Sequence, residues 1–170
     1  ILGTWSGVEP FFIRRLEAYD VANLGSDVIV GSMVVFLNGE KVTSEYRQFK
    51  LNNQGGDPGG IFQILSRRLK HQEWDLPQVI LVDGGKTQIS AAFQALYQEK
   101  LTKQIPILGL AKKEEKIIIP KIIDGEIKAW KTLKYQSSSL VHQLLQSVRD
   151  EAHHFAQRYY KKLHRKITFP

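Results

Sequence analysis

Apolar and polar positions follow three patterns along this chain, and each pattern predicts a different kind of element. Alternating or β-branched runs predict strands, apolar residues at helical spacing predict amphipathic helices, and unbroken apolar runs predict strands buried on both faces. In chain order, the expected elements are strands at about 11–22, 29–37 and 42–51, a helix at 61–70, a buried strand at 78–82, a helix at 87–100, a strand at 105–110, and a long final helix that follows a cap at 137–139 and ends near residue 163.

Turn residues mark the breaks between these elements. Asn38-Gly39 is a two-residue hairpin signal between the second and third strands. Residues 52–60 are rich in glycine, and we expect them to interrupt regular structure. The lysine-rich segment 112–136 contains two short β-like runs, which an Asp124-Gly125 turn separates. No internal repeat or long linker divides the chain.

The order of the predicted elements resembles that of a ribonuclease H-like sheet: three antiparallel strands, a helix, a parallel strand, a helix, a further strand and a C-terminal helix. The expected fold class is therefore α/β, with an RNase H-like mixed five-stranded sheet flanked by helices. In such a sheet the first strand and the parallel fourth strand are neighbours. Residues at the carboxyl ends of these two strands are then expected to face each other.

Asp83 ends the buried strand and begins the tetrapeptide Asp83-Gly84-Gly85-Lys86. An ionised carboxylate at this position loses hydration, and it favours a cation, a set of donors or a substrate nearby. Asp is also a common N-cap, so capping of the following helix is the alternative. Lys86 is a candidate contact for DNA.

Two other carboxylates are candidates for the same site. Asp20 shares a face of the first strand with Leu16 and Ala18, where a charge is costly unless something offsets it; the alternative is a strand-end Asp turned toward solvent. Asp57 lies in the glycine-rich loop, and its alternative role is a helix cap or turn residue. If Asp20, Asp57 and Asp83 converge, they repel one another, and divalent cations relieve the repulsion. Oxygen ligands favour Mg²⁺ or Mn²⁺, which can support two-metal phosphodiester cleavage.

The final helix carries a second group of candidate residues. His142, Arg149 and His153 form a row beside its apolar stripe, and we expect this row to border the core at the edge of a cleft. His153 is a candidate for acid–base catalysis or phosphate contact, and an exposed histidine on a polar face is the alternative. The basic end of the helix suits a phosphate backbone, although such runs are often solvated helix ends. The candidate DNA contacts of this helix are Arg149, Arg158, Lys161, Lys162 and Arg165.

Composition narrows the classes of function. The chain has 170 residues, 42% of them hydrophobic, and we expect one domain at 11–166 after an irregular segment at 1–10. Its 24 basic and 17 acidic residues give a net charge of +7, which favours nucleic acid over a membrane as the partner. There is no cysteine, which excludes disulfides and thiol catalysis and fits a reducing compartment. No apolar run has the length of a membrane span, and the first residue is not Met, so we expect a fragment of a longer protein.

Nucleotide-binding motifs are not supported. Gly85-Lys86-Thr87 resembles the end of a phosphate-binding P-loop, but Ile80 stands where that motif requires a glycine. The sequence also lacks a Gly-x-Gly-x-x-Gly fingerprint. We therefore expect no small-molecule cofactor.

Several segments match one known family in the same order. They are 15–21 (RLEAYDV), 31–36 (GSMVVF), 44–47 (SEYR), 79–86 (VILVDGGK), 108–112 (LGLAK) and 148–153 (VRDEAH). On these segments, which span about residues 10–166, the chain resembles the C-terminal endonuclease domain of UvrC, the incision subunit of bacterial nucleotide excision repair.

The resemblance implies a ribonuclease H-like fold and Mg²⁺- or Mn²⁺-dependent incision of damaged double-stranded DNA on the 5′ side of the lesion. It implies catalytic roles for Asp20, Asp57, Asp83 and His153, with the three carboxylates as metal ligands. It also implies a UvrB-type helicase subunit as partner, through regions outside this fragment, and a cytoplasmic location.

Three places depart from the family pattern. Val21-Ala22-Asn23-Leu24 replaces the family's Ile-Ser-His-Thr, Gly56 and Pro58 replace an acid and a tyrosine around Asp57, and Thr87 replaces a glycine. These changes surround the proposed ligands and can alter metal affinity and rate. Two competing hypotheses therefore remain: a catalytically weakened DNA-binding or scaffold domain, and a ribonuclease H-like enzyme that acts on an RNA–DNA hybrid or a branched junction.

Overall fold

The computed structural model describes most of the chain, namely residues 13–23, 29–52, 54–111, 116–134 and 140–168. Two predictions fall outside these residues: the irregular segment at 1–10 and the helix cap at 137–139.

A mixed sheet runs through the middle of the molecule. In the described residues its eight strands are β1 (Arg15–Asn23), β2 (Ile29–Leu37), β3 (Glu40–Lys41), β4 (Arg47–Leu51), β5 (Val79–Asp83), β6 (Ile107–Ala111), β7 (Lys116–Ile123) and β8 (Glu126–Lys134). Their order is β3-β2-β1-β5-β6-β7-β8, with β4 also paired to β2. The β1–β5 and β5–β6 pairs are parallel, and the other pairs are antiparallel.

The mixed α/β class is confirmed, but the sheet is larger than the predicted five strands. The five expected strands correspond to β1, β2, β4, β5 and β6. The additional strands are β3, which pairs with β2, and the β7–β8 hairpin, whose isoleucine run pairs with β6. The sequence showed the β-like runs of this hairpin, but their pairing to the main sheet depends on long-range contacts.

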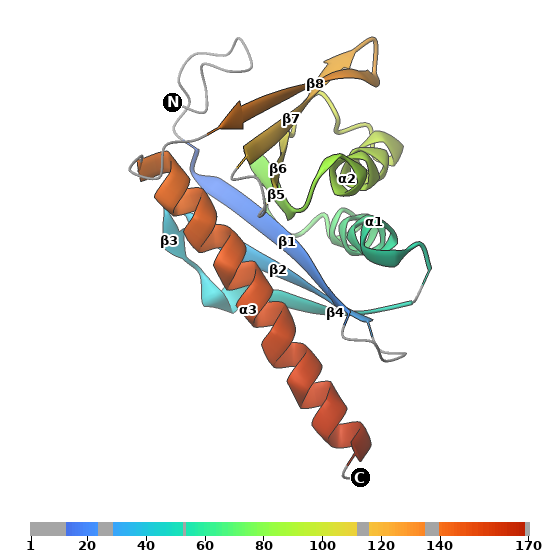
Figure 1. The fold of residues 1–170 in the computed structure, drawn as a ribbon, viewed down its shortest axis with the longest axis vertical. Coiled ribbons are helices and arrows are strands. Elements are labelled where there is room, and N and C mark those ends of the chain that lie inside the picture. The colour runs from blue at the N-terminus through green and yellow to red at the C-terminus, as the bar shows by residue number, and fades with distance from the viewer. Residues whose placement is uncertain (1–12, 24–28, 53, 112–115, 135–139, 169–170) are drawn as a thin grey trace.

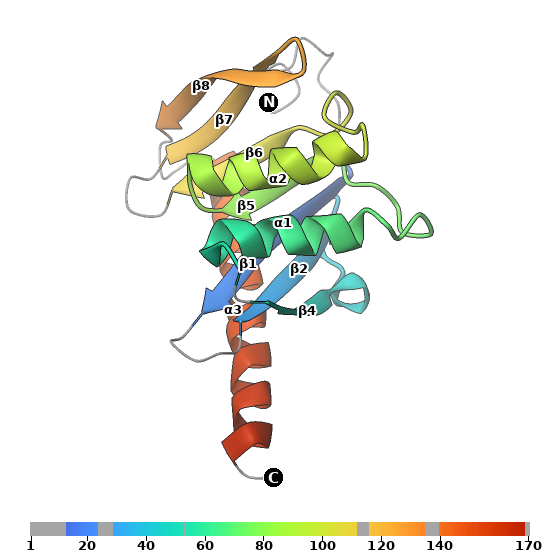
Figure 2. The same cartoon turned by 90° about the vertical axis from the view of Figure 1, so that its right-hand side faces the viewer.

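Helices cover both faces of the sheet. One face is covered by α1 (Gly56–Arg68) and α2 (Lys86–Gln98), and the other by α3 (Leu140–Thr168), which crosses β1 and β2 (Figures 1 and 2). The C-terminal part of α3 projects beyond the sheet (Figure 1). No helix in the described parts of the chain is long and apolar enough to cross a membrane.

The alternation of β1 places its residues in two separate cores. Leu16 and Ala18 pack on the α3 side, whereas Tyr19 and Val21 pack on the α1–α2 side. Because side chains on a strand point alternately to its two faces, Asp20 must lie on the α3 side.

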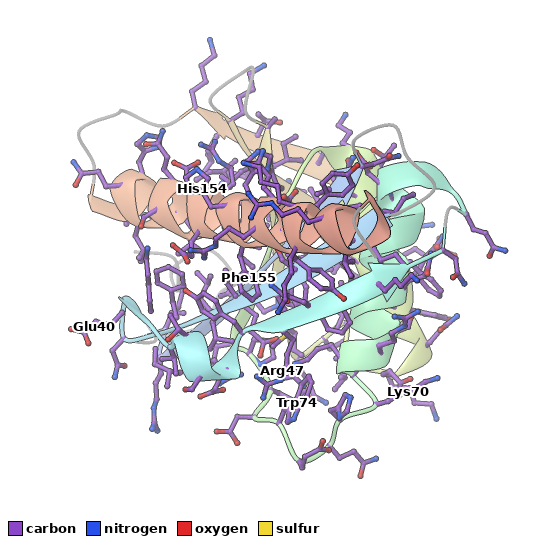
Figure 3. All side chains as sticks on the ribbon, turned by 90° about the horizontal axis from the view of Figure 1, so that it is seen from below. Glu40, Arg47, Lys70, Trp74, His154 and Phe155 are labelled. Carbon is purple, nitrogen blue, oxygen red and sulfur yellow. The ribbon has the colours of Figure 1, made fainter. Side chains whose placement is uncertain are left out.

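A buried charge network on the α1 side connects β1 to the end of α1. Glu17 is fully buried and accepts hydrogen bonds from Arg68 and from the hydroxyl of Tyr19. Trp74 covers the network, with the guanidinium carbon of Arg68 5.4 Å from its ring centroid and that of Arg47 4.7 Å away (Figure 3).

Both predicted hairpin turns are confirmed by their backbone angles. Asn38 and Gly39 have φ of 52° and 86°, and Asp124 and Gly125 have φ of 53° and 78°. Two consecutive positive φ values are typical of type I′ turns, which match the twist of the flanking strands.

The prediction that the whole glycine-rich segment lacks regular structure is wrong. Helix α1 begins at Gly56 and not at 61, after Gly55 with φ of 78°. Pro58 is tolerated because the first helical turn has no amide partners to lose. Gly60 is required by packing, since an added Cβ would lie 2.8 Å from a methyl of Val21. The predicted third strand is also shorter, because residues Thr43–Glu45 form a 3₁₀ turn before β4.

Candidate functional site

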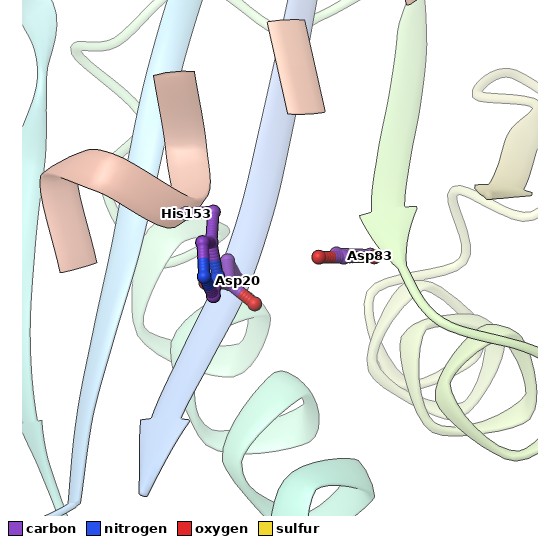
Figure 4. Close-up of side chains that lie close together, drawn as sticks. All are labelled: Asp20, Asp83 and His153. Atoms are coloured by element: carbon purple, nitrogen blue, oxygen red, sulfur yellow. The ribbon is translucent and has the colours of Figure 1, made fainter. Parts of the chain in front are cut away.

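Two carboxylates meet at the carboxyl edge of the sheet. Strands β1 and β5 run parallel and side by side, with Tyr19 opposite Val82. The next residues along the two strands are Asp20 and Asp83, so the expected proximity of these side chains is observed. Together with His153 of α3, they form a group in which one ligand atom from each residue lies within 4.8 Å of the other two (Figure 4).

The packing of α3 against the sheet positions His153. Ala152 is buried, and its carbonyl accepts a hydrogen bond of 2.8 Å from the hydroxyl of Ser32 on β2. Val148 and Ala156 are also fully buried, so consecutive turns of the helix are held against β1 and β2. His153 consequently stands over Asp20 with its side chain 38% exposed, at the border of the core as expected.

The hydrogen bonds of His153 define its tautomer. Its Nδ1 lies 3.0 Å from Oδ2 of Asp20, and its Nε2 lies 2.9 Å from the amide nitrogen of Gln157. In this orientation of its amide Gln157 donates to Nε2, and the imidazole proton is then on Nδ1. His153 therefore donates a hydrogen bond to the Asp20 carboxylate.

The surroundings of Asp20 disfavour the ionised form of its carboxyl group. Burial, and after it the nearby charge of Asp83, raise the pKa of its carboxyl from 3.8 to about 6, although His153 and the backbone hydrogen bond from Val21 act in the opposite direction. A raised carboxyl pKa means that this site disfavours negative charge, which a bound cation would offset.

The turn after β5 brings α2 close to the site. Gly84 has φ of 149°, and an added Cβ there would lie 2.6 Å from the side chain of Gln88. The same side chain accepts a hydrogen bond of 3.1 Å from the amide of Gly85. Within this turn glycine is needed for both conformation and space, and Gly85 rather than Asp83 is the N-cap of α2.

Asp57 lies apart from this group. It is exposed in the first turn of α1, on the opposite side of the sheet from α3. Among the described residues, the group of potential metal ligands contains Asp20, Asp83 and His153 and does not include Asp57. The structure thus brings together three of the four residues expected to be catalytic.

The predicted row of His142, Arg149 and His153 enters the core more deeply than expected. His142 and Arg149 are 5% and 7% exposed, because α3 lies flat against the sheet at this level. Arg149 forms an ion pair of 2.6 Å with the neighbouring Asp150. The expectation that the row borders the core without entering it is wrong for these two residues.

The other predicted DNA contacts are exposed. Lys86 begins α2, with its ammonium group 5.7 Å from the ring centroid of Trp130. Arg158 of α3 is 3.4 Å from Glu151 and keeps a side chain that is 65% exposed. The remaining exposed cations continue along the projecting part of α3 and are Lys161, Lys162 and Arg165.

Sequence reasoning missed the role of Gln157. It lies four residues after His153 on α3, a spacing at which helical side chains are neighbours. That spacing alone could have identified it as a partner of the imidazole.

The chemistry of the donors fits a hard divalent cation. Two carboxylates converge at a partly buried position, and the burial and mutual repulsion that raise the pKa of Asp20 would be offset by positive charge. Carboxylate oxygens are the preferred ligands of Mg²⁺ and Mn²⁺.

The fold and the site together define a ribonuclease H-like domain with paired carboxylates at the ends of adjacent parallel strands. A family model described as the UvrC RNAse H endonuclease domain matches residues 10–157. The chain belongs to this family.

Full-length relatives agree with this assignment. The UvrABC system protein C of Carboxydothermus hydrogenoformans is 37% identical over 166 residues, which cover 90% of this chain and 26% of that protein. The UvrABC system protein C of Methanococcoides burtonii is 40% identical over 147 residues, which cover 84% of this chain and 23% of that protein. The chain thus spans about a quarter of the length of these relatives.

Solved structures of endonuclease V share the fold. The Ciona intestinalis enzyme, in complex with a 24mer DNA that contains an inosine followed by a ribo-adenosine, matches with a TM-score of 0.55 and 14% identity, over 92% of this chain and 90% of that chain. The Bacillus subtilis enzyme matches with a TM-score of 0.50 and 16% identity, over 88% and 83%. These likenesses establish the ribonuclease H-like fold.

Proposed function

We propose that this chain is a metal-dependent DNA endonuclease domain that incises damaged double-stranded DNA on the 5′ side of the lesion in nucleotide excision repair. One observation carries the proposal: Asp20, Asp83 and His153 converge at the carboxyl edge of the sheet in a member of the UvrC endonuclease family. The domain is proposed to extend over 11–166 and to act in the cytoplasm.

The metal ligands are proposed to be the oxygens of Asp20 and Asp83, which meet from neighbouring strands. A bound Mg²⁺ or Mn²⁺ would supply positive charge to the phosphodiester and lower the pKa of a coordinated water. Asp20 is held in place by the hydrogen bond from His153, and Asp83 is held by its position at the end of a buried strand.

The role proposed for His153 is proton transfer at Nε2. Its Nδ1 is engaged with Asp20, so Nε2 is the nitrogen that can meet the substrate. The amide of Gln157 occupies Nε2 in the free protein, and the attacking water, which can donate a hydrogen bond to Nε2, would replace this amide. An imidazole hydrogen-bonded to a carboxylate is well suited to accept a proton, because the carboxylate stabilises the imidazolium.

Asp57 is proposed as a further ligand, and it requires a movement of the first turn of α1. Its exposure and its separation from the other carboxylates also favour the second candidate function, a catalytically weakened domain that binds DNA as a scaffold. The endonuclease and the scaffold proposals differ in one point, which is whether Asp20 and Asp83 support cleavage of DNA.

The DNA duplex is proposed to reach the site along α3. Arg158, Lys161, Lys162 and Arg165 are exposed on the part of the helix beyond His153, and cations at such spacing can follow a phosphate backbone. Lys86 is proposed to contact DNA on the other side of Asp83. A UvrB-type helicase subunit is proposed as a partner through regions outside this chain, as the relatives' name UvrABC system suggests.

Nicking of supercoiled plasmid with Mn²⁺ tests the proposal. The wild-type chain should nick the plasmid, and Asp83→Asn should reduce the rate by at least about 100-fold, because even indirect partners of metal ligands contribute 10–100-fold. Asp75→Asn, on the exposed loop before β5, is the matched control and should retain the rate. Equal nicking by wild type and Asp83→Asn would refute the catalytic assignment. Binding of the plasmid without nicking would favour the scaffold.

A further inference from the structure

A second basic surface lies on the α2 side of the sheet, at the edge where the carboxylate pair lies on the α3 side, and here the start of α2 meets the β7–β8 hairpin. It consists of Lys86, Lys116, Trp130 and Lys134, and we refer to it as the hairpin cluster. The residues come from one helix and two strands that are adjacent in space. Lys86 and Lys134 are exposed, and Lys116 and Trp130 are half-buried.

Strand register places the two strand lysines of the hairpin cluster at the same edge of the sheet as the carboxylates. Asp83 is opposite Leu110 on β6, and the next residue of β6, Ala111, is opposite Lys116. Lys116 is in turn opposite Lys134. Strand β8 is three strands away from β5, a distance of about 14 Å at the usual spacing of neighbouring strands.

The same register places the side chains of the three strand residues on the α2 side. Ile118 and Trp130 both pack in the core on this side, and Lys116 and Lys134 follow them at alternate positions. The start of α2 lies against this surface, since a Cβ on Gly85 would be 4.0 Å from Ile118. The ammonium group of Lys86 is 5.7 Å from the ring centroid of Trp130, so the ring holds Lys86 against this face of the hairpin.

The charges of this cluster favour a polyanion. Lys116 and Lys134 are directly opposite each other, and like charges at such positions destabilise a sheet. Lysines on an edge strand can also serve to prevent sheet-to-sheet pairing. That explanation applies to Lys134 on the edge strand β8, but not to Lys116 on β7 or to Lys86 on α2. A row of phosphates, in contrast, would interact favourably with all three.

We propose that the hairpin cluster binds the phosphate backbone of DNA next to the cleaved bond, on the side of Asp83 opposite to α3. With an axial rise of about 3.4 Å per nucleotide, the 14 Å between β5 and β8 corresponds to about four nucleotides of duplex. Trp130 positions Lys86 for this contact. The inference rests on the proposed function, because it takes the substrate to be DNA that is cleaved at the carboxylate pair.

The test compares two double variants that remove the same charge from opposite faces of one hairpin. Lys116→Ala/Lys134→Ala alters the hairpin cluster. Lys121→Ala/Lys131→Ala is the control, because these exposed lysines lie on the α3 side of the hairpin. Ile119 packs in the core on that side. Lys131 is opposite Ile119, and Lys121 follows Ile119 at the next alternate position of the strand.

Affinity for a fluorescein-labelled DNA duplex is measured by anisotropy over a range of KCl concentrations, with EDTA present so that cleavage does not enter. The cluster variant should bind on the order of tenfold more weakly, as expected for two exposed ion pairs. Its slope of log affinity against log salt should be less steep by about 1 per lysine. The control should stay within about twofold of wild type by the same estimate. Lys161→Ala/Lys162→Ala tests the end of α3 in the same assay and should also flatten the slope.

Similar affinities and slopes for the two hairpin variants would overturn the inference, as would a wild-type chain that does not bind the duplex. Thermal unfolding of each variant shows whether the fold is intact. Plasmid nicking by the wild type separates the two proposals. If the wild type nicks the plasmid but the two hairpin variants bind DNA with the same affinity, the proposed DNA contact is refuted and the nuclease function is supported. If the cluster variant alone loses affinity but the wild type does not nick the plasmid, the DNA contact is supported and the nuclease function is refuted.

Discussion

Two buried carboxylates on β1, only three residues apart, have opposite surroundings. Glu17 faces α1 and is fully buried, with hydrogen bonds of 2.8 and 3.0 Å from Arg15, 2.9 and 3.0 Å from Arg68, and 2.5 Å from the hydroxyl of Tyr19. Asp20 faces α3 and is 6% exposed. The side chains next to it are a second carboxylate and a histidine.

The difference shows that burial alone does not distinguish a structural carboxylate from a functional one. The protein itself supplies Glu17 with two guanidinium groups, which satisfy its charge. Tyr19 stays protonated and donates to it, because burial and the nearby Glu17 raise the pKa of the phenol well above its ordinary value. At Asp20 the protein supplies Asp83, which adds negative charge, so the balance favours a cation from solution.

The largest expected effect is on stability at Glu17. Glu17→Gln should lower the free energy of unfolding by about 3–5 kcal/mol, because it leaves the buried guanidinium of Arg68 without its counter-charge and leaves Arg15 with Glu45 alone. Urea denaturation measures the change. Glu45→Gln is the control, since Glu45 also pairs with Arg15 but has a side chain that is 37% exposed. The control should cost at most about 1 kcal/mol. If both variants lose the same free energy of unfolding, Glu17 contributes no more to stability than the more exposed Glu45.

The next effect is on turnover at His153. His153→Ala should reduce the rate of plasmid nicking by roughly 100-fold, the lower range for loss of a general acid or base. Duplex affinity and thermal stability should change little, because the side chain is partly exposed. The matched control is His154→Ala, because the neighbouring His154 is exposed on the same helix (Figure 3). If His153→Ala nicks the plasmid as fast as the control, His153 is a surface histidine without a role in cleavage.

The smallest effect is a gain in stability at Asp20, measured in EDTA. Folding raises the pKa of Asp20 from about 3.8 to about 6, so the ionised form is less stable in the folded protein. The resulting penalty is absent below pH 4, grows between about pH 4 and 6, and is complete above that range. Asp20→Asn removes the charge and should raise the free energy of unfolding by about 1–3 kcal/mol at pH 8, and hardly at all near pH 4. A loss of stability at pH 8 would show that Asp20 is a satisfied carboxylate like Glu17.

Local patterns predicted the parts of the fold that depend on neighbouring residues. The alternation of β1 indicated that Leu16, Ala18 and Asp20 share a face, and Leu16 and Ala18 pack there as expected. Asn38-Gly39 and Asp124-Gly125 indicated turns that require positive φ, which these residue types adopt at little cost.

Predictions failed where distant segments decide the structure. The close approach of Gly60 in α1 to Val21 on β1 joins segments that are far apart in the sequence, and no local pattern shows it. The burial of Arg149 depends on how closely α3 lies on the sheet. Similarly, the sequence contains Glu17 and Arg68 but does not reveal that they meet, because they are 51 residues apart.

The sequence by itself determined that Asp83 ends one central strand and which face of the other carries Asp20, since unbroken apolar runs and a period of two are local patterns. Family motifs added the names of the residues expected to act there. Tertiary structure alone decided which charges are satisfied. It gave Glu17 two arginines, placed Asp83 and His153 against Asp20, and left Asp57 on another layer. Electrostatic interactions depend on distances between atoms from separate elements, and those distances exist only once the sheet and helices have packed.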